Sequence, residues 1–147
     1  MPLVICIVIK IKNMKYIFDE NKDLLHIVYR KEDFKLREDI VRPEEFIQVA
    51  SLKLNKGQTF KPHMHLWKKV KEEMKIAQES WVIIQGSVKV NYYDTKGNPL
   101  ADEILYAGDC TITLQGGHNY KSLEENTLVY EFKTGPYEGQ SKDKIFI

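Results

Sequence analysis

Four side chains in this sequence have the types and the spacing of a metal site. One residue separates His63 from His65, Glu79 precedes an apolar run, and His118 follows two glycines. Because side chains of a β-strand alternate between its two faces, two histidines one residue apart direct both imidazoles to the same side. A carboxylate and a third imidazole from neighbouring strands would complete a pocket for one divalent metal ion. The sequence therefore predicts these metal ligands: His63, His65, Glu79 and His118.

The predicted ligand set leaves a net positive site with open positions for water or substrate. Imidazole suits zinc, copper, iron and nickel, whereas a carboxylate shifts the preference toward manganese and iron. We expect one divalent ion, with iron, manganese, zinc and nickel all open. Because ligating imidazoles must be neutral, we expect the metal to be lost as the pH falls through the histidine range.

The overall composition describes an ordinary single domain. The chain has 147 residues, 43% of them hydrophobic and 29% charged, and a net charge of +1. Such a balance argues against a nucleic-acid partner, and no segment has the length of a membrane span. Two cysteines, Cys6 and Cys110, are too few for a disulfide framework, which favours a reducing, cytoplasmic setting.

The first twelve residues, MPLVICIVIKIK, are apolar and β-branched. They do not form a signal peptide, because no positively charged segment precedes the apolar run and no cleavage site follows it. Two interpretations stay open: a first strand packed on a sheet, or a translated extension with Met14 as the working start. We therefore divide the chain into residues 1–13 and a single domain over residues 14–147.

Most of the remaining chain has the pattern of short strands separated by turns. Residues 94–99, DTKGNP, are a strong hairpin turn, and Gln85-Gly86 interrupts a long β-prone run. Closely spaced strands without a long helical pattern predict an all-β sandwich or barrel. The expected strands are Phe46–Leu54, Thr59–Leu66, the two halves of Ser80–Tyr93, Ile104–Tyr106, Cys110–Leu114, a strand that begins at His118, and Thr127–Lys133.

A charged insertion, residues 66–78, lies between the second and third predicted ligands. Leu66, Val70 and Met74 recur at a spacing of four, which fits a short amphipathic helix, and a long hairpin with a charged tip is the other interpretation. The insertion could cover the pocket, although a solvated excursion is the simpler expectation. Trp67 is the exception, because it lies two residues after His65 and could form a pocket wall.

Alternation along the strands also predicts the rest of the pocket lining. If Glu79 faces inward, then Trp81 and Ile83 do too, and Tyr120 follows His118 in the same way. An apolar, aromatic lining suits a small polar ring or a carboxylate that the metal anchors. A lone histidine on a strand, such as His26, is expected to be an ordinary surface or core residue.

The spacing of these residues resembles that of the cupin superfamily. Gly57, His63 and His65, followed by Glu79 and Gly86, look like its first motif, and Gly108 with Gly116-Gly117-His118 looks like its second. The resemblance covers residues 57 to about 122. It implies a double-sheet jelly-roll barrel in which His63, His65, Glu79 and His118 bind the metal.

Three departures from the cupin pattern concern the later ligands. Thirteen residues separate His65 from Glu79, where the family has three or four. Leu114 stands where the second motif has proline, and the turn before His118 is one residue shorter. Ser122 replaces the asparagine that follows the third histidine. We expect His118 to reach the pocket nevertheless, because the Gly-Gly turn can absorb the change through positive φ values.

For function, the resemblance implies a metal-dependent enzyme, such as an isomerase, an epimerase or a dioxygenase. Its substrate would be small and polar: a sugar, a sugar derivative or an oxo-acid. The alternative is a non-catalytic module that binds a small ligand and holds a structural metal. The resemblance also implies a homodimer, for which the apolar chain ends and the charged insertion supply candidate interface surface.

Overall fold

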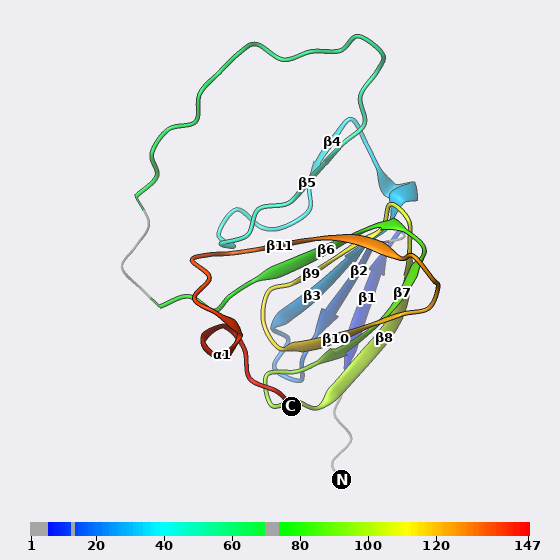
Figure 1. Cartoon of the computed structure of the whole chain (residues 1–147), viewed down its shortest axis with the longest axis vertical. Coiled ribbons are helices and arrows are strands. Elements are labelled where there is room, and N and C mark those ends of the chain that lie inside the picture. The colour runs from blue at the N-terminus through cyan, green and yellow to red at the C-terminus, as the bar shows by residue number, and fades with distance from the viewer. Residues whose placement is uncertain (1–5, 13, 70–73) are drawn as a thin grey trace.

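The computed structural model describes residues 6–12, 14–69 and 74–147, and it is built almost entirely from antiparallel strands (Figure 1). The prediction of an all-β fold is therefore confirmed. The larger of its sheets has six strands, which follow one another in space as β1 (Ile7–Ile11), β2 (Met14–Phe18), β3 (Leu24–Tyr29), β9 (Cys110–Thr113), β6 (Glu79–Gln85) and β11 (Leu128–Lys133).

A smaller sheet faces the large one. Its strands are ordered β10 (Gly117–Ser122), β7 (Ser87–Tyr93) and β8 (Pro99–Tyr106). A separate pair joins β4 (Arg37–Asp39) to β5 (Ala50–Leu52). The described helices are the 3-10 turn η1 (Lys31–Asp33) and α1 (Gln140–Asp143), and no described helix is long and apolar enough to cross a membrane.

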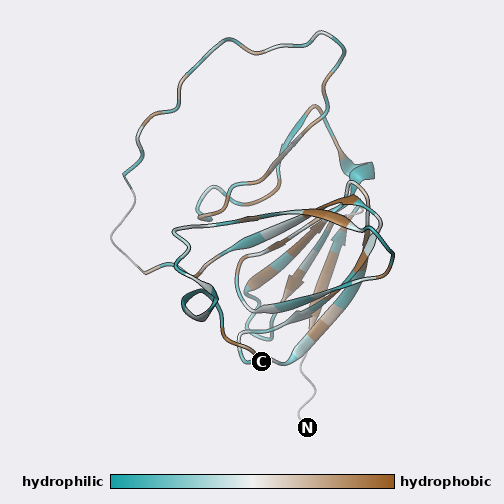
Figure 2. Cartoon of the chain, in the orientation of Figure 1, coloured by the Kyte–Doolittle hydropathy of each residue, from teal (hydrophilic) through white to brown (hydrophobic). Residues whose placement is uncertain are grey.

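Both faces of the large sheet are buried at its central strands, β3 and β9. On its inner face Ile17, Val28 and Ile83 pack against apolar residues of the small sheet, such as Val90 and Leu105. On the other face, a second cluster is formed by Ile27, Tyr29, Ile40, Val41, Ile47, Ile112 and Leu114. Burial on both sides explains why the central strands lack a clean polar–apolar alternation, and Figure 2 shows hydrophobic residues gathered in the strands rather than in η1 or α1.

Several predicted strands agree with the observed strands in their residue ranges. Ser80–Tyr93 is divided into β6 and β7 around Gly86, which has a φ of +78°. Residues 94–99 form the predicted hairpin turn, in which a carboxylate oxygen of Asp94 accepts hydrogen bonds from the backbone N–H groups of Lys96 and Asn98, each at 2.8 Å. The strands expected at 110–114, from His118 and at 127–133 correspond to β9, β10 and β11.

Two predicted strands are wrong or too long. Phe46–Leu54 contributes only the three residues of β5. Thr59–Leu66, which carries both histidines of the predicted pair, contains no strand and is exposed. Pro62 gives a physical reason, because proline lacks the N–H that a ladder requires and is confined to edges and irregular positions.

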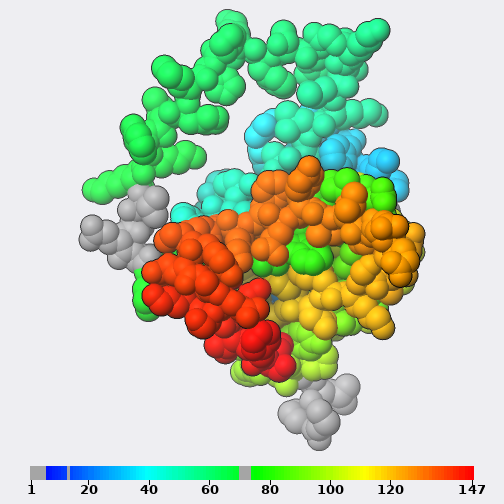
Figure 3. All heavy atoms as spheres, in the orientation of Figure 1, coloured from blue at the N-terminus to red at the C-terminus, as the bar shows by residue number. Residues whose placement is uncertain are grey.

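The insertion adopts neither expected form in its described parts. Residues 66–69 and 74–78 belong to no helix or strand, Gln78 leads directly into β6, and residues 70–73 lie outside the described residues. Most of the described residues between β5 and β6 stand away from the two sheets (Figure 1) and form a thin string of atoms in the space-filling view (Figure 3). Trp67 is fully exposed.

The N-terminal segment is an edge strand where it is described. Ile7–Ile11 forms β1 and pairs in register with β2, from Ile7 opposite Phe18 to Ile11 opposite Met14. Residues 1–5 and 13 lie outside the described residues. The choice between Met1 and Met14 as the working start stays a prediction.

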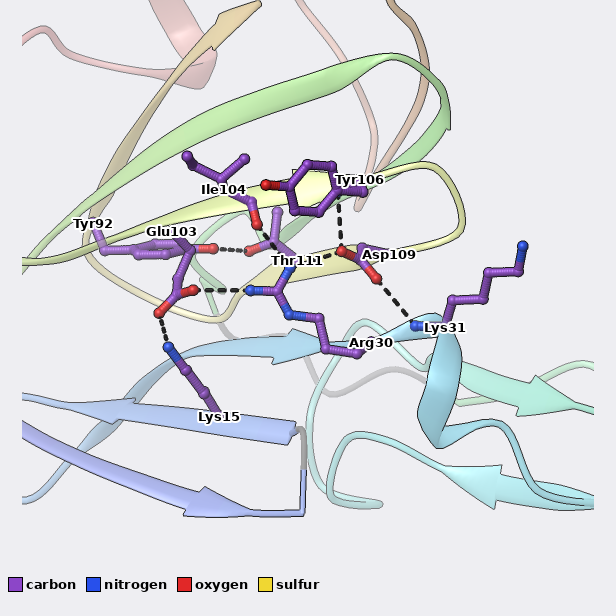
Figure 4. Close-up of polar contacts among 9 residues, drawn as sticks. All are labelled: Lys15, Arg30, Lys31, Tyr92, Glu103, Ile104, Tyr106, Asp109 and Thr111. Carbon is purple, nitrogen blue, oxygen red and sulfur yellow. Dashed lines mark hydrogen bonds and ion pairs between the residues drawn. The ribbon is translucent and has the colours of Figure 1, made fainter. Parts of the chain in front are cut away.

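A cluster of charged groups joins the two sheets at one end (Figure 4). The guanidinium of Arg30, which follows β3, donates at 2.7 Å to Asp109, at 2.8 Å to Glu103 and at 2.7 Å to the carbonyl of Ile104. Asp109 is buried and also accepts from the backbone N–H groups of Lys31 and Tyr106, each at 3.0 Å. Glu103 and Ile104 belong to β8, so the cluster links the small sheet to the large one.

The burial of this cluster predicts a large cost for removing its carboxylate. We expect Asp109→Ala to lower the free energy of unfolding by about 3–5 kcal/mol, because Arg30 would lose one of its two carboxylate partners and the N–H groups of Lys31 and Tyr106 would lose their acceptor. The control is Asp39→Ala, whose ion pair with Arg37 is exposed (65% and 61%) and for which we expect less than about 1 kcal/mol. Urea unfolding measures both, and equal losses in the two variants would contradict the assignment.

Candidate functional site

At the opposite end of the same strands, Glu79 and His118 meet across the gap between the two sheets. Glu79 opens β6 and pairs with Thr113 of β9, whereas His118 lies near the start of β10 opposite Tyr92. The imidazole Nε2 of His118 is 3.1 Å from the Glu79 carboxylate Oε1, and the two side chains are 20% and 12% exposed. The structure thus brings two of the four predicted ligands into direct contact.

A chain of hydrogen bonds continues from this pair into the protein. The Nδ1 atom of His118 is 2.9 Å from the hydroxyl of Thr113. The same hydroxyl is 3.1 Å from Nδ1 of His26, whose Nε2 lies 3.0 Å from the carbonyl oxygen of Tyr93. Three strands of the large sheet and two of the small one therefore contribute to one continuous polar path.

His26 is the buried member of this path. Its side chain is fully inaccessible, and burial lowers its pKa from 6.5 to about 4 despite the hydrogen bond to Tyr93. Desolvation has this direction because a charged imidazole loses its hydration in the core. His26 is therefore a neutral core residue at physiological pH.

The Gly-Gly turn before His118 makes room for this arrangement. A Cβ atom on Gly116, which has a φ of +83°, would collide with the carbonyl oxygen of Tyr93 and lie 3.3 Å from Nε2 of His26. A Cβ on Gly117 would lie 2.8 Å from the Cδ1 atom of Ile147. Gly116 therefore permits the close approach that the His26–Tyr93 hydrogen bond needs.

Aromatic rings line one side of the pair. Trp81 stacks on Tyr120 with ring centroids 3.8 Å apart and an interplanar angle of 10°, and Tyr120 is also 4.8 Å from the ring of His118. Burial, reinforced by the nearby Glu79 carboxylate, raises the pKa of Tyr120, and its hydroxyl has no hydrogen-bond partner among the described residues. Ile83 lies on the same inner face but deeper, in the core between the sheets.

The other two predicted ligands do not join this group. His63 and His65 are exposed in the segment between β5 and β6, with their rings 5.3 Å apart, and Nδ1 of His63 lies 2.9 Å from the carbonyl of Lys61. Among the residues that the structure describes, no three histidine, cysteine, aspartate or glutamate side chains are close enough to hold a metal ion. The pair of Glu79 and His118 is thus the part of the predicted ligand set that the structure assembles.

Two members of this site, His26 and Thr113, were not among the residues predicted from the sequence to form it. His26 was expected to be an ordinary strand residue, and its location in the apolar run Leu24–Tyr29 is the signal that it is buried. A buried histidine needs hydrogen-bond partners, but sequence spacing does not identify them. Thr113 carries no signal of its own. Cys110 is buried on the outer face, and burial raises its pKa to about 12.

The chain is thus an all-β protein of two facing antiparallel sheets, with a carboxylate–imidazole pair at one end. Comparisons with protein-family models, with curated proteins and with solved structures each found no match.

The pKa of His26 predicts how stability depends on pH. In the unfolded chain His26 binds a proton below pH 6.5, but in the folded protein only below about 4. The unfolded state therefore binds more protons between these values, so stability falls by about 3 kcal/mol as the pH drops through this window. Replacing His26 by glutamine removes this contribution.

Urea unfolding at several pH values measures this effect as the difference in slope between wild type and His26→Gln. The matched control is Thr111→Val, which removes a buried polar group from the same inner face without removing a titrating group and should leave the slope at its wild-type value. A slope that is the same in all three proteins would show that His26 titrates normally.

Proposed function

We propose that this chain is a small, metal-dependent jelly-roll protein of the cupin type, which binds one divalent ion through Glu79 and His118 and acts on a small polar substrate. The observation that carries the proposal is the contact between Nε2 of His118 and the Glu79 carboxylate, with Nδ1 of the same ring held by Thr113. Histidine ligands of metals have this arrangement, in which the second ring nitrogen bonds an outer partner that fixes the ring.

The topology supports the jelly-roll part of the proposal. From β6 onward, the chain passes from the large sheet to β7 and β8 of the small one, returns to β9, crosses again to β10 and returns to the large sheet in β11. Double-sheet jelly rolls alternate between facing antiparallel sheets in this way.

The donor set fits a metal ion in part. A carboxylate and an imidazole nitrogen are ligands for iron, manganese, zinc and nickel, but two protein ligands alone do not make a strong site. In the described parts of the chain β10 has a neighbour only on its β7 side, and residues 59–66 have no strand partner. His63 and His65 would complete the set if that segment paired along the free edge of β10, where Pro62 is tolerated.

A bound metal would supply Lewis-acid polarisation of a substrate oxygen, or a site for dioxygen if the metal is iron. The protein's own contribution would be to position the substrate. Trp81 and Tyr120 offer a flat aromatic wall beside the pair, and the unpartnered Tyr120 hydroxyl is a donor for a polar ligand. A sugar, a sugar derivative or an oxo-acid fits such a site. A homodimer and a cytoplasmic setting remain expectations from the sequence.

One observation favours the second candidate, a non-catalytic small-ligand module with a structural metal. Two surface hollows, of about 420 and 410 Å³, lie away from Glu79 and His118. The first is lined by residues around Arg30 and Tyr106, and the second by residues around Tyr16 and Arg42. Beside the pair itself, Trp81 and Tyr120 occupy space by stacking on each other.

The test is the metal content of protein purified without added metal, measured by mass spectrometry. We expect close to one metal ion per chain in wild type and almost none in Glu79→Gln/His118→Ala. The His63→Ala/His65→Ala variant should also lose the metal if the four-ligand set is complete. Asp102→Asn is the control, because Asp102 is exposed and pairs with Lys89, and it should keep wild-type occupancy.

Each result has a defined meaning. Iron would favour oxygen chemistry, whereas zinc, manganese or nickel would favour Lewis-acid chemistry. Metal retained in the His63/His65 variant would remove these two residues from the ligand set. Absence of metal from wild type, even after reconstitution with iron, manganese, zinc and nickel, would overturn the proposal.

A further inference from the structure

The hydrogen bonds that run from His118 through Thr113 and His26 to Tyr93 have a fixed order of donors and acceptors. This order can be derived from the Tyr93 end. The carbonyl oxygen of Tyr93 can only accept a hydrogen bond, so Nε2 of His26, 3.0 Å away, must carry a proton and donate it. His26 is fully buried, and a neutral imidazole carries one proton. Its Nδ1 is therefore a lone-pair acceptor.

The hydroxyl of Thr113 has one proton and can donate only one hydrogen bond. It donates this proton to the lone pair on Nδ1 of His26, 3.1 Å away. With that proton used, the Thr113 oxygen can only accept at its second contact, 2.9 Å from Nδ1 of His118. Nδ1 of His118 must therefore carry a proton.

The reverse direction is unfavourable. It would need a proton on Nδ1 of His26 while Nε2 faced the Tyr93 carbonyl without one, or a doubly protonated His26. The first leaves two acceptors 3.0 Å apart in the core, and the second buries an unpaired charge. The low pKa of His26 agrees with its neutral form.

We propose that His26 and Thr113 are positioning residues that hold one proton of His118 on Nδ1. Nε2, which in the metal-free protein donates to the acceptor-only Glu79 carboxylate at 3.1 Å, is then the nitrogen that releases its proton to bind a cation. This inference rests on the proposed function, because Nε2 is the atom through which His118 would bind the metal. It extends that function inward, to two residues that touch neither the metal nor a substrate.

The path also assigns a function to the Gly-Gly turn. Any side chain at Gly116 would push against the Tyr93 carbonyl, the acceptor at which the direction begins. The second motif of the sequence thus contributes both a ligand, His118, and the space that its supporting hydrogen bonds need.

Variants of one hydroxyl test the inference. Thr113→Val removes the hydroxyl, and Thr113→Ser restores it. The matched control is Thr111→Val: Thr111 lies two residues earlier on the same inner face of β9, is equally buried and bonds the Tyr92 hydroxyl at 2.7 Å, but it is not part of the path. Any general loss from removing a buried hydroxyl therefore appears in both valine variants.

Two measurements separate the inference from the proposed function. The first is nitrogen-15 NMR of the imidazole of His118 in metal-free protein, which reports whether Nδ1 carries a proton protected from exchange with solvent. We expect this proton in wild type, Thr113→Ser and Thr111→Val, and its loss in Thr113→Val. The second is the affinity for Zn²⁺ alone, measured by titration. We expect about a 10-fold loss in Thr113→Val, the size typical of losing an outer partner of a ligating histidine.

The outcomes are distinguishable. An unprotonated Nδ1 in wild type, or equal Zn²⁺ affinity in wild type and Thr113→Val, would overturn the positioning inference and leave the metal proposal in place. A protected Nδ1 proton without Zn²⁺ binding in any variant would overturn the metal proposal while the hydrogen-bond direction stood. A loss of affinity in Thr111→Val equal to that in Thr113→Val would show that the effect is one of stability, and would also overturn the inference.

Discussion

The bonds of Arg30 to Asp109 and Glu103 are the constraint on which the facing of the two sheets depends. They join the end of β3 to β8 and to the turn before β9, and they are largely shielded from water. An apolar interface between sheets has no directional preference of its own, whereas a planar guanidinium with fixed donors accepts only a narrow range of positions. The cluster therefore sets how far apart the two sheets lie and how they are aligned.

The same strands reach the candidate site four residues away. Arg30 directly follows β3, four residues after His26, and Asp109 directly precedes β9, four residues before Thr113, so about 13 Å of extended chain separates the two polar ends. Between them the inner face packs Val28 and Tyr92 in the core, and the buried hydroxyls of Thr111 and Tyr92 bond each other at 2.7 Å. At one end, the ion pairs of Arg30 link the two sheets. At the other end, the neutral side chains of His26 and Thr113 form hydrogen bonds that lead to the partly exposed Glu79 and His118. The rigid end holds the alignment that lets His118 reach Glu79 at 3.1 Å.

Sequence reasoning identified features that local chemistry determines. The hairpin at residues 94–99 depends on Asp94 and Gly97, and the interruption at Gly86 depends on its positive φ, so both could be predicted from residue type. The inward facing of Glu79 with Trp81 follows from period-two alternation alone. The expected strand at residues 59–66 is wrong because pairing is a tertiary property, and Pro62 weakens the local preference.

Other parts of the site could not be derived from spacing. β2 and β3 were not proposed, because burial on both faces removes the alternation that marks a strand. His26 and Thr113 are 87 residues apart, and their contact arises only when β3 pairs with β9. A hydrogen bond between distant residues leaves no pattern in a single sequence, so the support behind His118 could be found only in three dimensions.

Glu79 pairs with Thr113 in the ladder between β6 and β9, so the formation of the site depends on the register of these two strands. A slip of one residue along this ladder would turn Glu79 toward the outer apolar cluster and bring Ser80 to the inner face, because every side chain of a strand changes sides together. The ladder therefore has no intermediate in which the carboxylate is merely displaced. Substitutions that loosen this register, even far from the pair, would divide the population into molecules with a complete site and molecules with none.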